Sequence, residues 1–409
     1  MKKSILKEYA KIIVKIGANV QKGQDVVITC NVDDNYFAQY LVEECYKAKC
    51  RKVTVDFVSD EVNRLKYKYE KEEDLAEFPN WLHERWKYYV DKLPVRIYID
   101  SSDPDSLNGL NQEKITNVRK ITGPIIRSYR DQMDNKYQWV IAGIPGIKWA
   151  RKVFPNLSNK KAMEKLWDTI LDVTRCKGDG IKNWEIHNKT LKEKTDKLNS
   201  LGIKKLYYKN SIGTDFEIEL PKEMIFGSGS EVTYSGIVYN PNMPTEECFT
   251  SPNKFTANGK VFASKPLSVM GSVVSDFGFR FENGKIVEVY SDKEDEKSLL
   301  EKLISVDEGA SYLGEVALVP FDSPINKSGV LFYSTLYDEN AVCHLALGES
   351  FTECIRDYQK LSEDEIKKLP LNKSAIHVDF MIGTSDLEIK ALTYNGDMVT
   401  IFKDGVFAI

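Results

Sequence analysis

The spacing of hydrophobic and polar residues changes character along the chain, near residue 201. Before that point, apolar runs of strand length such as DVVITC alternate with stretches of helical periodicity such as NYFAQYLVEECYKAKC. Strands and helices in alternation are typical of a parallel sheet with helices packed on its faces. We therefore expect residues 1–200 to form an α/β N-terminal domain with a mostly parallel sheet.

The expected elements of this domain follow from the period and length of each segment. An amphipathic helix opens the chain, because Leu6, Tyr9, Ile13 and Ile16 recur at steps of three and four residues. Three further strands are expected at KVTVDFV, VRIYID and QWVIAGIP, and helical segments near residues 75–90 and 160–174.

The second half is rich in short strands separated by glycine turns. FRFENGKIVEVY, VALVPF and the terminal DMVTIFKDGVFAI are examples. This pattern predicts a mainly antiparallel α+β or β-barrel-like C-terminal domain over residues 201–409. A charged helix around residues 192–201 is the expected connector.

Composition narrows the class of protein. The net charge is −4, with 57 basic and 61 acidic residues well mixed, which indicates neither a nucleic-acid partner nor an anionic membrane surface. No run approaches the roughly 20 apolar residues of a membrane span, and the lysines inside the first apolar run are not typical of a signal peptide. Seven scattered cysteines without a CxxC motif indicate reduced thiols in a cytoplasmic protein rather than disulfides or a thiolate zinc site.

A doubly wound domain raises the question of a bound dinucleotide. The first strand is followed by CNVDDNYF, which contains no glycine, although a pyrophosphate needs glycines there to approach the backbone. The glycines of GSGSEV, beginning at Gly227, lack both the third glycine and a surrounding βαβ unit. The sequence therefore disfavours a nucleotide cofactor.

The segment IHVDFMIG predicts a strand with two unlike faces. Its apolar members alternate with His377, Asp379 and Met381, so the imidazole and the carboxylate share one face. Burying such groups is costly unless each has a partner, which can be another side chain or a metal ion.

Other segments of the second half carry similar groups close to apolar strands. These candidates are Glu246 and Glu247 in NPNMPTEECFTSP, Glu315 in YLGEVALVPF, and Asp338, Glu339 and His344 in TLYDENAVCHLALG. A single glutamate near a turn is usually solvated, and a single histidine on an apolar face is usually a hydrogen-bonded core residue. Together, two histidines and several carboxylates suit zinc, cobalt or manganese, and a carboxylate can bridge two such ions.

Several long blocks, in one order, resemble the aminopeptidase T family, also known as the M29 metallopeptidases or thermophilic aminopeptidases. The blocks are LKEYAKIIVKIGANVQKGQDVVI, EFPNW with RWKYYVD, QWVIAGIPGIKWARKVFP, NPNMPTEECFTSP, LGEVALVP, LYDENAVCHLALG, NKSAIHVDFMIG and IFKDGVFAI. They run nearly from end to end of the chain. The resemblance implies a metal-dependent aminopeptidase that removes N-terminal residues from short peptides, with two divalent ions, zinc, cobalt or manganese, and a homodimer.

The resemblance also implies which residues hold the ions. The family's metal ligands fall on Glu247, Glu315, His344, His377 and Asp379, with Glu315 as the expected bridge. Glu246 is not assigned as a ligand and is the candidate general base, although neighbours in a strand point to opposite faces. Asp338 and Glu339 are candidates for binding the substrate's α-amine, and Asp338 could instead orient His344.

The chain departs from the family pattern at one position. Seven residues after the ligand histidine the family usually has tyrosine, and here the residue is Phe351. If that hydroxyl stabilises the oxyanion, its loss costs about 10²–10³ in kcat; Tyr333, Tyr337 or Tyr358 could replace it, or a metal could carry the charge alone. Two alternatives therefore stay open: another dimetal hydrolase, acting on phosphoesters or amides, and a non-catalytic homologue that keeps the metal.

Overall fold

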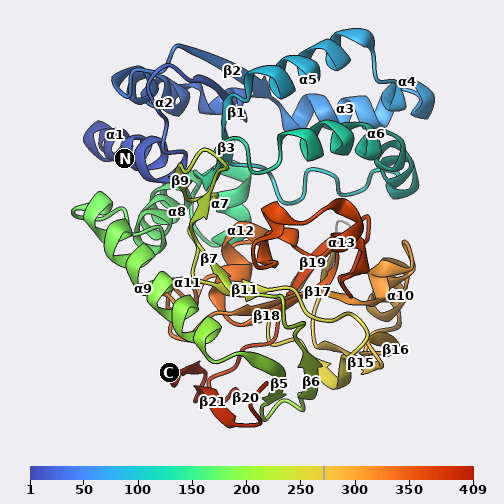
Figure 1. Ribbon diagram of the computed structural model, residues 1–409. Coiled ribbons are helices and arrows are strands. Elements are labelled where there is room, and N and C mark those ends of the chain that lie inside the picture. Colours follow the sequence, from blue (N-terminus) through green and yellow to red (C-terminus); the bar gives the residue numbers. More distant parts are fainter. Residues whose placement is uncertain (270–271) are drawn as a thin grey trace. The chain divides into compact units, whose positions relative to one another are not determined.

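The computed structural model of the chain describes residues 1–269 and 272–409 (Figure 1). The chain forms two compact units: residues 1–185 with 230–244, and residues 186–229 with 245–409. The division into domains at residue 200 remains a prediction. Among the described residues, no helix is both long and apolar enough to span a membrane.

The first unit contains a five-stranded parallel sheet, as the alternating pattern predicts. Its strands lie in the order β10-β4-β3-β1-β2, and all neighbours are parallel. Their bounds are β1 Asp25–Asn31, β2 Lys52–Val58, β3 Val95–Asp100, β4 Trp139–Gly143 and β10 Asn242–Met243. A short hairpin of β8 (Glu231–Val232) and β9 (Val238–Tyr239) belongs to the same unit.

Helices fill the connections between these strands. Their bounds are α1 Lys3–Ile12, α2 Asn35–Lys47, α3 Asp60–Tyr69, α4 Glu72–Ala76, α5 Asn80–Lys92, α6 Gln112–Met133, α7 Ile147–Val153 and α8 Asn159–Val173. The next helix, α9 Gly180–Ser200, belongs mostly to the second unit. Tyr9, Phe37 and Trp167 form an aromatic cluster that joins α1, α2 and α8, with ring centroids 5.7–6.2 Å apart. Tyr89 and Met133 of α5 and α6 pack on Val27 of β1.

Two helices differ from their expected extents. The helical region predicted near residues 75–90 is two helices, because the backbone is extended at Glu77 and Pro79. Proline fixes φ near −65° and disfavours a helical conformation in the preceding residue, so α5 begins only after Pro79. The connector helix α9 begins at Gly180, twelve residues before the predicted start.

The second unit is mainly antiparallel, which confirms the predicted fold class. An eight-stranded sheet runs in the order β16-β15-β12-β6-β5-β20-β21-β22. Its strands are β5 Ile203–Lys209, β6 Asp215–Glu219, β12 Asn258–Phe262, β15 Phe277–Glu282, β16 Lys285–Ser291, β20 Glu388–Thr393, β21 Met398–Lys403 and β22 Val406–Phe407. The smaller pair β13 (Leu267–Val269) and β14 (Ser272–Val274) forms a sheet of its own.

A second, five-stranded sheet of this unit has the order β19-β18-β17-β11-β7 (Figure 1). Its strands are β7 Gly227–Ser228, β11 Cys248–Thr250, β17 Leu313–Leu318, β18 His344–Gly348 and β19 His377–Met381. The remaining helices are α10 Glu294–Ile304, α11 Pro324–Lys327, α12 Thr335–Asp338 and α13 Glu363–Lys368, with the 3-10 turn η4 at Glu339–Ala341.

One hydrophobic core joins the two sheets of the second unit. Leu345 and Phe380 of the five-stranded sheet belong to the same buried cluster as Phe279 and Ile389 of the eight-stranded sheet. The rings of Phe279 and Phe380 lie 5.4 Å apart. The inward face of β17, β18 and β19 is therefore apolar, and their polar residues occupy the other face.

Candidate metal centre

Four neighbouring segments of the five-stranded sheet carry the predicted ligands. Because β19, β18, β17 and β11 lie side by side, residues that are far apart in sequence come together. The register places Ala346 of β18 opposite both Glu315 of β17 and Asp379 of β19. The two acids thus lie in one row across three strands, separated by a residue whose side chain is a single methyl group.

The alternation along each strand decides which face carries these groups. His344, Ala346 and Gly348 share one face of β18, whereas Leu345 and Leu347 lie in the core. The ladder pairs His344 with Ala317 and Gly348 with His377. Small residues thus stand between the polar ones, which leaves space above the sheet.

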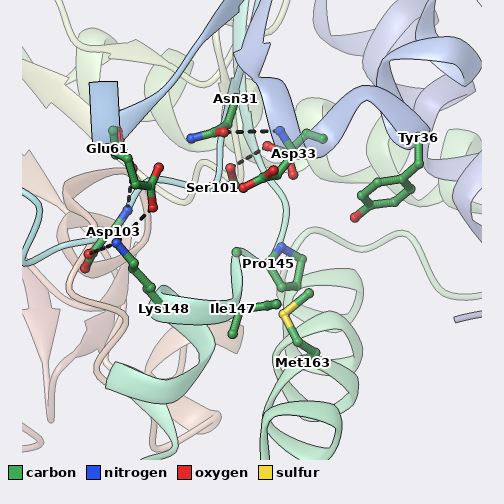
Figure 2. A pocket seen from close by; sticks show the side chains of 13 residues that line it. Asn31, Asp33, Tyr36, Glu61, Ser101, Asp103, Pro145, Ile147, Lys148 and Met163 are labelled. Carbon is green, nitrogen blue, oxygen red and sulfur yellow. Dashed lines mark hydrogen bonds and ion pairs between the residues drawn. The ribbon is translucent and has the colours of Figure 1, made fainter. Parts of the chain in front are cut away.

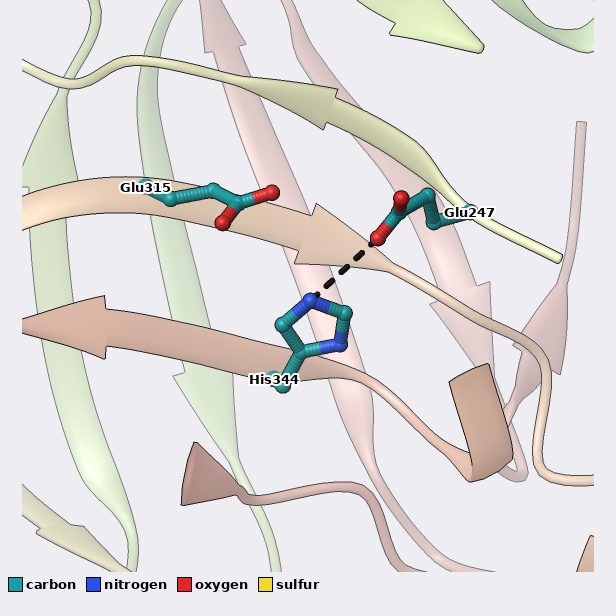
Figure 3. A group of neighbouring side chains, drawn as sticks. All are labelled: Glu247, Glu315 and His344. Carbon is teal, nitrogen blue, oxygen red and sulfur yellow. Dashed lines mark ion pairs between the residues drawn. The ribbon is translucent and has the colours of Figure 1, made fainter. Parts of the chain in front are cut away.

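Two groups of possible ligand atoms result, and they share one residue. Glu247, Glu315 and His344 form one group and Glu315, His377 and Asp379 the other, with the ligand atoms of each group within 4.8 Å of one another. Figure 3 shows the side chains of Glu247, Glu315 and His344 pointing toward one another, with His344 Nε2 3.3 Å from Glu247 Oε2. All five residues that the family resemblance assigns to the metal therefore lie together.

The histidines are oriented by the main chain. Nδ1 of His377 lies 2.9 Å from the carbonyl oxygen of Glu349, and Nδ1 of His344 lies 3.4 Å from that of Val342. When Nδ1 donates to a carbonyl, the lone pair of the neutral ring is on Nε2. Nε2 of His377 lies 3.1 Å from Glu315 Oε2 and 3.3 Å from Asp379 Oδ1, so each ring presents its free nitrogen to the acids.

The electrostatics of the cluster are those of a site that requires positive charge. Burial raises the pKa of Glu315 to about 7, although His377 donates a hydrogen bond to it. Burial would lower the pKa of both imidazoles, but their carboxylate neighbours raise it to about 10 for His344 and about 12 for His377. Burial would likewise raise the pKa of Asp379, and the hydrogen bond and charge of His377 hold it below its usual value. In the metal-free protein, protons on the imidazoles supply positive charge among these carboxylates, and a bound cation would supply the same charge.

Glu339, in the turn η4, belongs to the same electrostatic cluster. Burial, followed by the charges of Asp379 and Glu247, raises its pKa well above the usual value. From the sequence, Glu339 is expected only as a candidate for binding the substrate amine. The signal that could have found it is its position five residues before His344, in the short turn that leads into β18.

The other candidates have defined surroundings. The backbone N–H of Glu246 donates to Asn340 Oδ1 over 2.7 Å, and Glu246 is in neither ligand group. Asn340 is fully buried, and its Nδ2 lies 3.3 Å from Glu339 Oε1, so it ties the segment before Glu247 to η4. The carboxylate of Asp338 accepts from the backbone of Phe332 and Ser334 and closes the turn before α12.

Phe351 lies against the cluster from one side. Its ring centroid is 4.9 Å from that of His377 and 5.4 Å from that of Phe249. Tyr358 packs in the same apolar cluster as Phe351 and Phe249, and Tyr337 is buried and stacked on Phe332 at 4.6 Å. An apolar ring therefore contacts the imidazole of His377, one of the predicted ligands.

A separate cavity lies in the first unit, near the carboxyl ends of its parallel strands. It has a volume of about 560 Å³ and is lined by Asn31, Asp33, Asp34, Tyr36, Asp60, Glu61, Ser101, Asp103, Pro145, Gly146, Ile147, Lys148 and Met163 (Figure 2). Lys148 is paired with Glu61 and Asp103, at 2.9 and 3.3 Å. Burial raises the pKa of Asp34 to about 6. A lining with this excess of carboxylates repels a pyrophosphate, so the cavity gives no support to a dinucleotide.

Comparisons with known proteins cover the whole chain. The model of a family described as thermophilic metalloprotease (M29) matches residues 2–407. Aminopeptidase AmpS of Bacillus subtilis is 39% identical over 405 residues, 98% of each chain. Aminopeptidase T of Thermus thermophilus is 34% identical over 409 residues, 99% of this chain and 98% of that one. The solved structure of wild-type AmpT from Thermus thermophilus superposes with a TM-score of 0.91 at 33% identity and covers both chains fully.

The protonation of the cluster predicts how metal binding depends on pH. Since the pKa of both imidazoles is raised above 8, both carry a proton at pH 6–8 in the metal-free protein, and each must lose it before Nε2 can bind an ion. We expect the apparent affinity for Zn²⁺ to rise about tenfold or more per pH unit between pH 6 and 8. Competition with a chelator of known affinity at pH 6, 7 and 8 measures this, and an affinity independent of pH would contradict it.

Proposed function

Because the chain belongs to the M29 family of thermophilic metalloproteases, we propose that it removes N-terminal residues from short peptides by metal-assisted hydrolysis. The enzyme is a metalloaminopeptidase. The observation that carries the proposal is the pair of ligand groups that share Glu315.

The donor set fits two divalent cations. Glu247, His344 and Glu315 would hold one ion, and His377, Asp379 and Glu315 the other, with Glu315 as the bridge. Imidazole with carboxylate suits zinc, cobalt or manganese, and availability selects among them. Bound ions of this kind supply polarisation of the scissile carbonyl and lower the pKa of water toward neutrality.

The protein's own residues supply proton transfer. The attacking water must lose a proton and the leaving amine must gain one, so a carboxylate beside the ions can accept the first and deliver the second. Neither Glu339 nor Glu246 is in a ligand group, but Glu339 is the better candidate, because the charges of Asp379 and Glu247 act on its carboxyl group. We propose that the Glu339 carboxylate holds this proton, or completes the ligand set as a sixth donor.

Phe351 shapes the site without a hydroxyl. Its ring packs on His377 and cannot donate a hydrogen bond to an oxyanion. In the proposed enzyme that charge is left to the ions and to the backbone, and the apolar ring excludes water from one side of the imidazole.

We also propose a homodimer, which the family resemblance implies. α3 buries none of its residues, and Val62, Leu65 and Tyr69, 55%, 52% and 71% exposed, lie on one face of it. A contiguous apolar face on a soluble protein commonly marks an interaction site. Light scattering should give twice the mass of one chain for the native protein and a lighter species for Leu65→Asp. The mass of a single chain for the native protein would contradict the dimer.

The proposal includes a cytoplasmic location. All seven cysteines are buried and unpaired by disulfides, as is usual in a reducing compartment. Cell fractionation with an antibody to the protein tests this.

The function is tested by hydrolysis of unblocked dipeptides. We expect release of free amino acids that stops when a chelator removes the metal and returns when Zn²⁺, Co²⁺ or Mn²⁺ is added. His344→Ala should lower kcat/KM about 100-fold or more and reduce bound metal, because one imidazole donor is lost. His83→Ala is the matched control, since His83 bonds Tyr129 in the first unit. Activity that survives metal removal would refute the proposal, as would cleavage of phosphoesters but not peptides.

A pair of isosteric substitutions distinguishes the two candidate proton carriers. Glu339→Gln should lower kcat about 100-fold or more, because general acid–base catalysis contributes at least that much, whereas Glu246→Gln should lower it less than about tenfold. Bound metal measured on both variants separates loss of proton transfer from loss of a ligand. The reverse order of the two effects would restore Glu246 as the general base.

A further inference from the structure

Lys265 is a cation with no assigned partner in the second unit. Its side chain is partly buried, and among the described ion pairs and hydrogen bonds none involves its ammonium group. Burial lowers its pKa, opposed only by the charge of Asp338. A half-buried ammonium is costly when the acid that acts on it, Asp338, also accepts two backbone hydrogen bonds, and an anionic ligand would lower that cost.

Two contacts place Lys265 beside the metal centre. The backbone N–H of its neighbour Ser264 donates to the carbonyl of Met381 over 2.8 Å, and Met381 is the ladder partner of His344. Ser264 therefore bonds the last residue of β19, the strand that carries His377 and Asp379.

The second contact is electrostatic. The ammonium interacts with the charge of Asp338, the last residue of α12, and the next residue is Glu339. The carboxylate of Asp338 is already committed to the backbone N–H groups of Phe332 and Ser334. The Lys265 ammonium is thus within electrostatic range of Asp338, the residue directly before Glu339, and its backbone neighbour Ser264 bonds β19.

A second donor accompanies the lysine. The hydroxyl oxygen of Ser264 is buried and has no hydrogen-bond partner. Buried hydroxyl groups are usually bonded, and an exception in a native structure calls for an explanation. The Ser264 hydroxyl is thus an unsatisfied polar group next to Lys265, and the lysine ammonium is the donor that a substrate anion can reach.

We propose that Lys265 binds the C-terminal carboxylate of short peptide substrates and so selects for di- and tripeptides. This inference rests on the proposed function. A peptide whose first carbonyl lies at the ions extends roughly 3.5 Å per further residue, so the carboxylate of a di- or tripeptide falls within a few ångströms of that carbonyl. The ammonium of Lys265, at the end of a four-carbon stem, meets the carboxylate there as a flexible point charge.

The location favours the carboxylate over the oxyanion as the ligand of Lys265. The lysine is not among the charges that chiefly shift the pKa of Glu315, His344 or Asp379. A cation that touched the reacting carbonyl would lie among those groups. Lys265 acts on Asp338 instead.

The test compares one dipeptide as the free acid with the same dipeptide as its C-terminal amide. The native enzyme should prefer the free acid. Lys265→Met should raise KM for the free acid about 10- to 100-fold, the worth of one charge-assisted hydrogen bond, with kcat and both constants for the amide little changed. Lys265→Arg should restore part of the preference, because it keeps the charge.

Lys205→Met serves as the control. This lysine is partly buried in the same unit but is paired with Glu217 and Glu219. Its substitution should therefore leave the ratio of kcat/KM for the acid and the amide unchanged. If Lys265→Met lowers kcat/KM equally for the free acid and the amide, the inference is wrong. It is also wrong if kcat/KM changes for neither substrate. If Lys265→Met does not fold, Lys265→Gln replaces it.

The failure of the proposed function is distinguishable from the failure of this inference. If the native protein hydrolyses no unblocked peptide, the function is wrong, and calorimetric titration with the same acid and amide tests the lysine separately. Tighter binding of the acid that disappears in Lys265→Met would support the inference. Equal affinities in the native protein would overturn it.

Discussion

The physical constraint behind the second unit is the repulsion among buried carboxylates. Glu247, Glu315, Glu339 and Asp379 interact through a medium of low polarity, where like charges destabilise one another strongly. Without cations the cluster can persist only by binding protons on the imidazoles and on the acids themselves. Burial, followed by the charges of its acidic neighbours, raises the pKa of Glu315, and carboxylate neighbours raise that of His344. Divalent ions would supply positive charge to the same carboxylates.

The backbone prepares this arrangement before any ion arrives. Four neighbouring strands bring the groups into register, and Nδ1 of each imidazole lies against a backbone carbonyl. Asn340 connects the segment of Glu247 to the turn of Glu339. The hydrogen bonds of the sheet therefore fix most of the relative positions of these side chains. Backbone support of this kind holds metal ligands within narrow tolerances. The hydrophobic core between the two sheets fixes the other face of the same strands.

Much of the fold could be predicted from local patterns. The parallel sheet of the first unit follows from alternating strands and helices, and the split between α4 and α5 could have been placed at Pro79. The shared face of His377 and Asp379 follows from a period of two. The meeting of β11, β17, β18 and β19 could not be predicted from local patterns, since strand order depends on contacts between distant residues. For those positions only the family resemblance was informative, and it did not extend to Glu339, whose position depends on a turn of three residues.

The small side chain of Ala346 is a condition for metal binding at the proposed centre. It stands between Glu315 and Asp379 in the middle strand of the row, with its neighbours Leu345 and Leu347 in the core. The strand would pair equally well with a valine there, because β-branched residues favour sheets. The added methyl groups, however, would occupy the volume that the cations need. A single substitution at this position could thus remove metal binding while leaving the fold intact, so that loss of catalysis would not require loss of the protein.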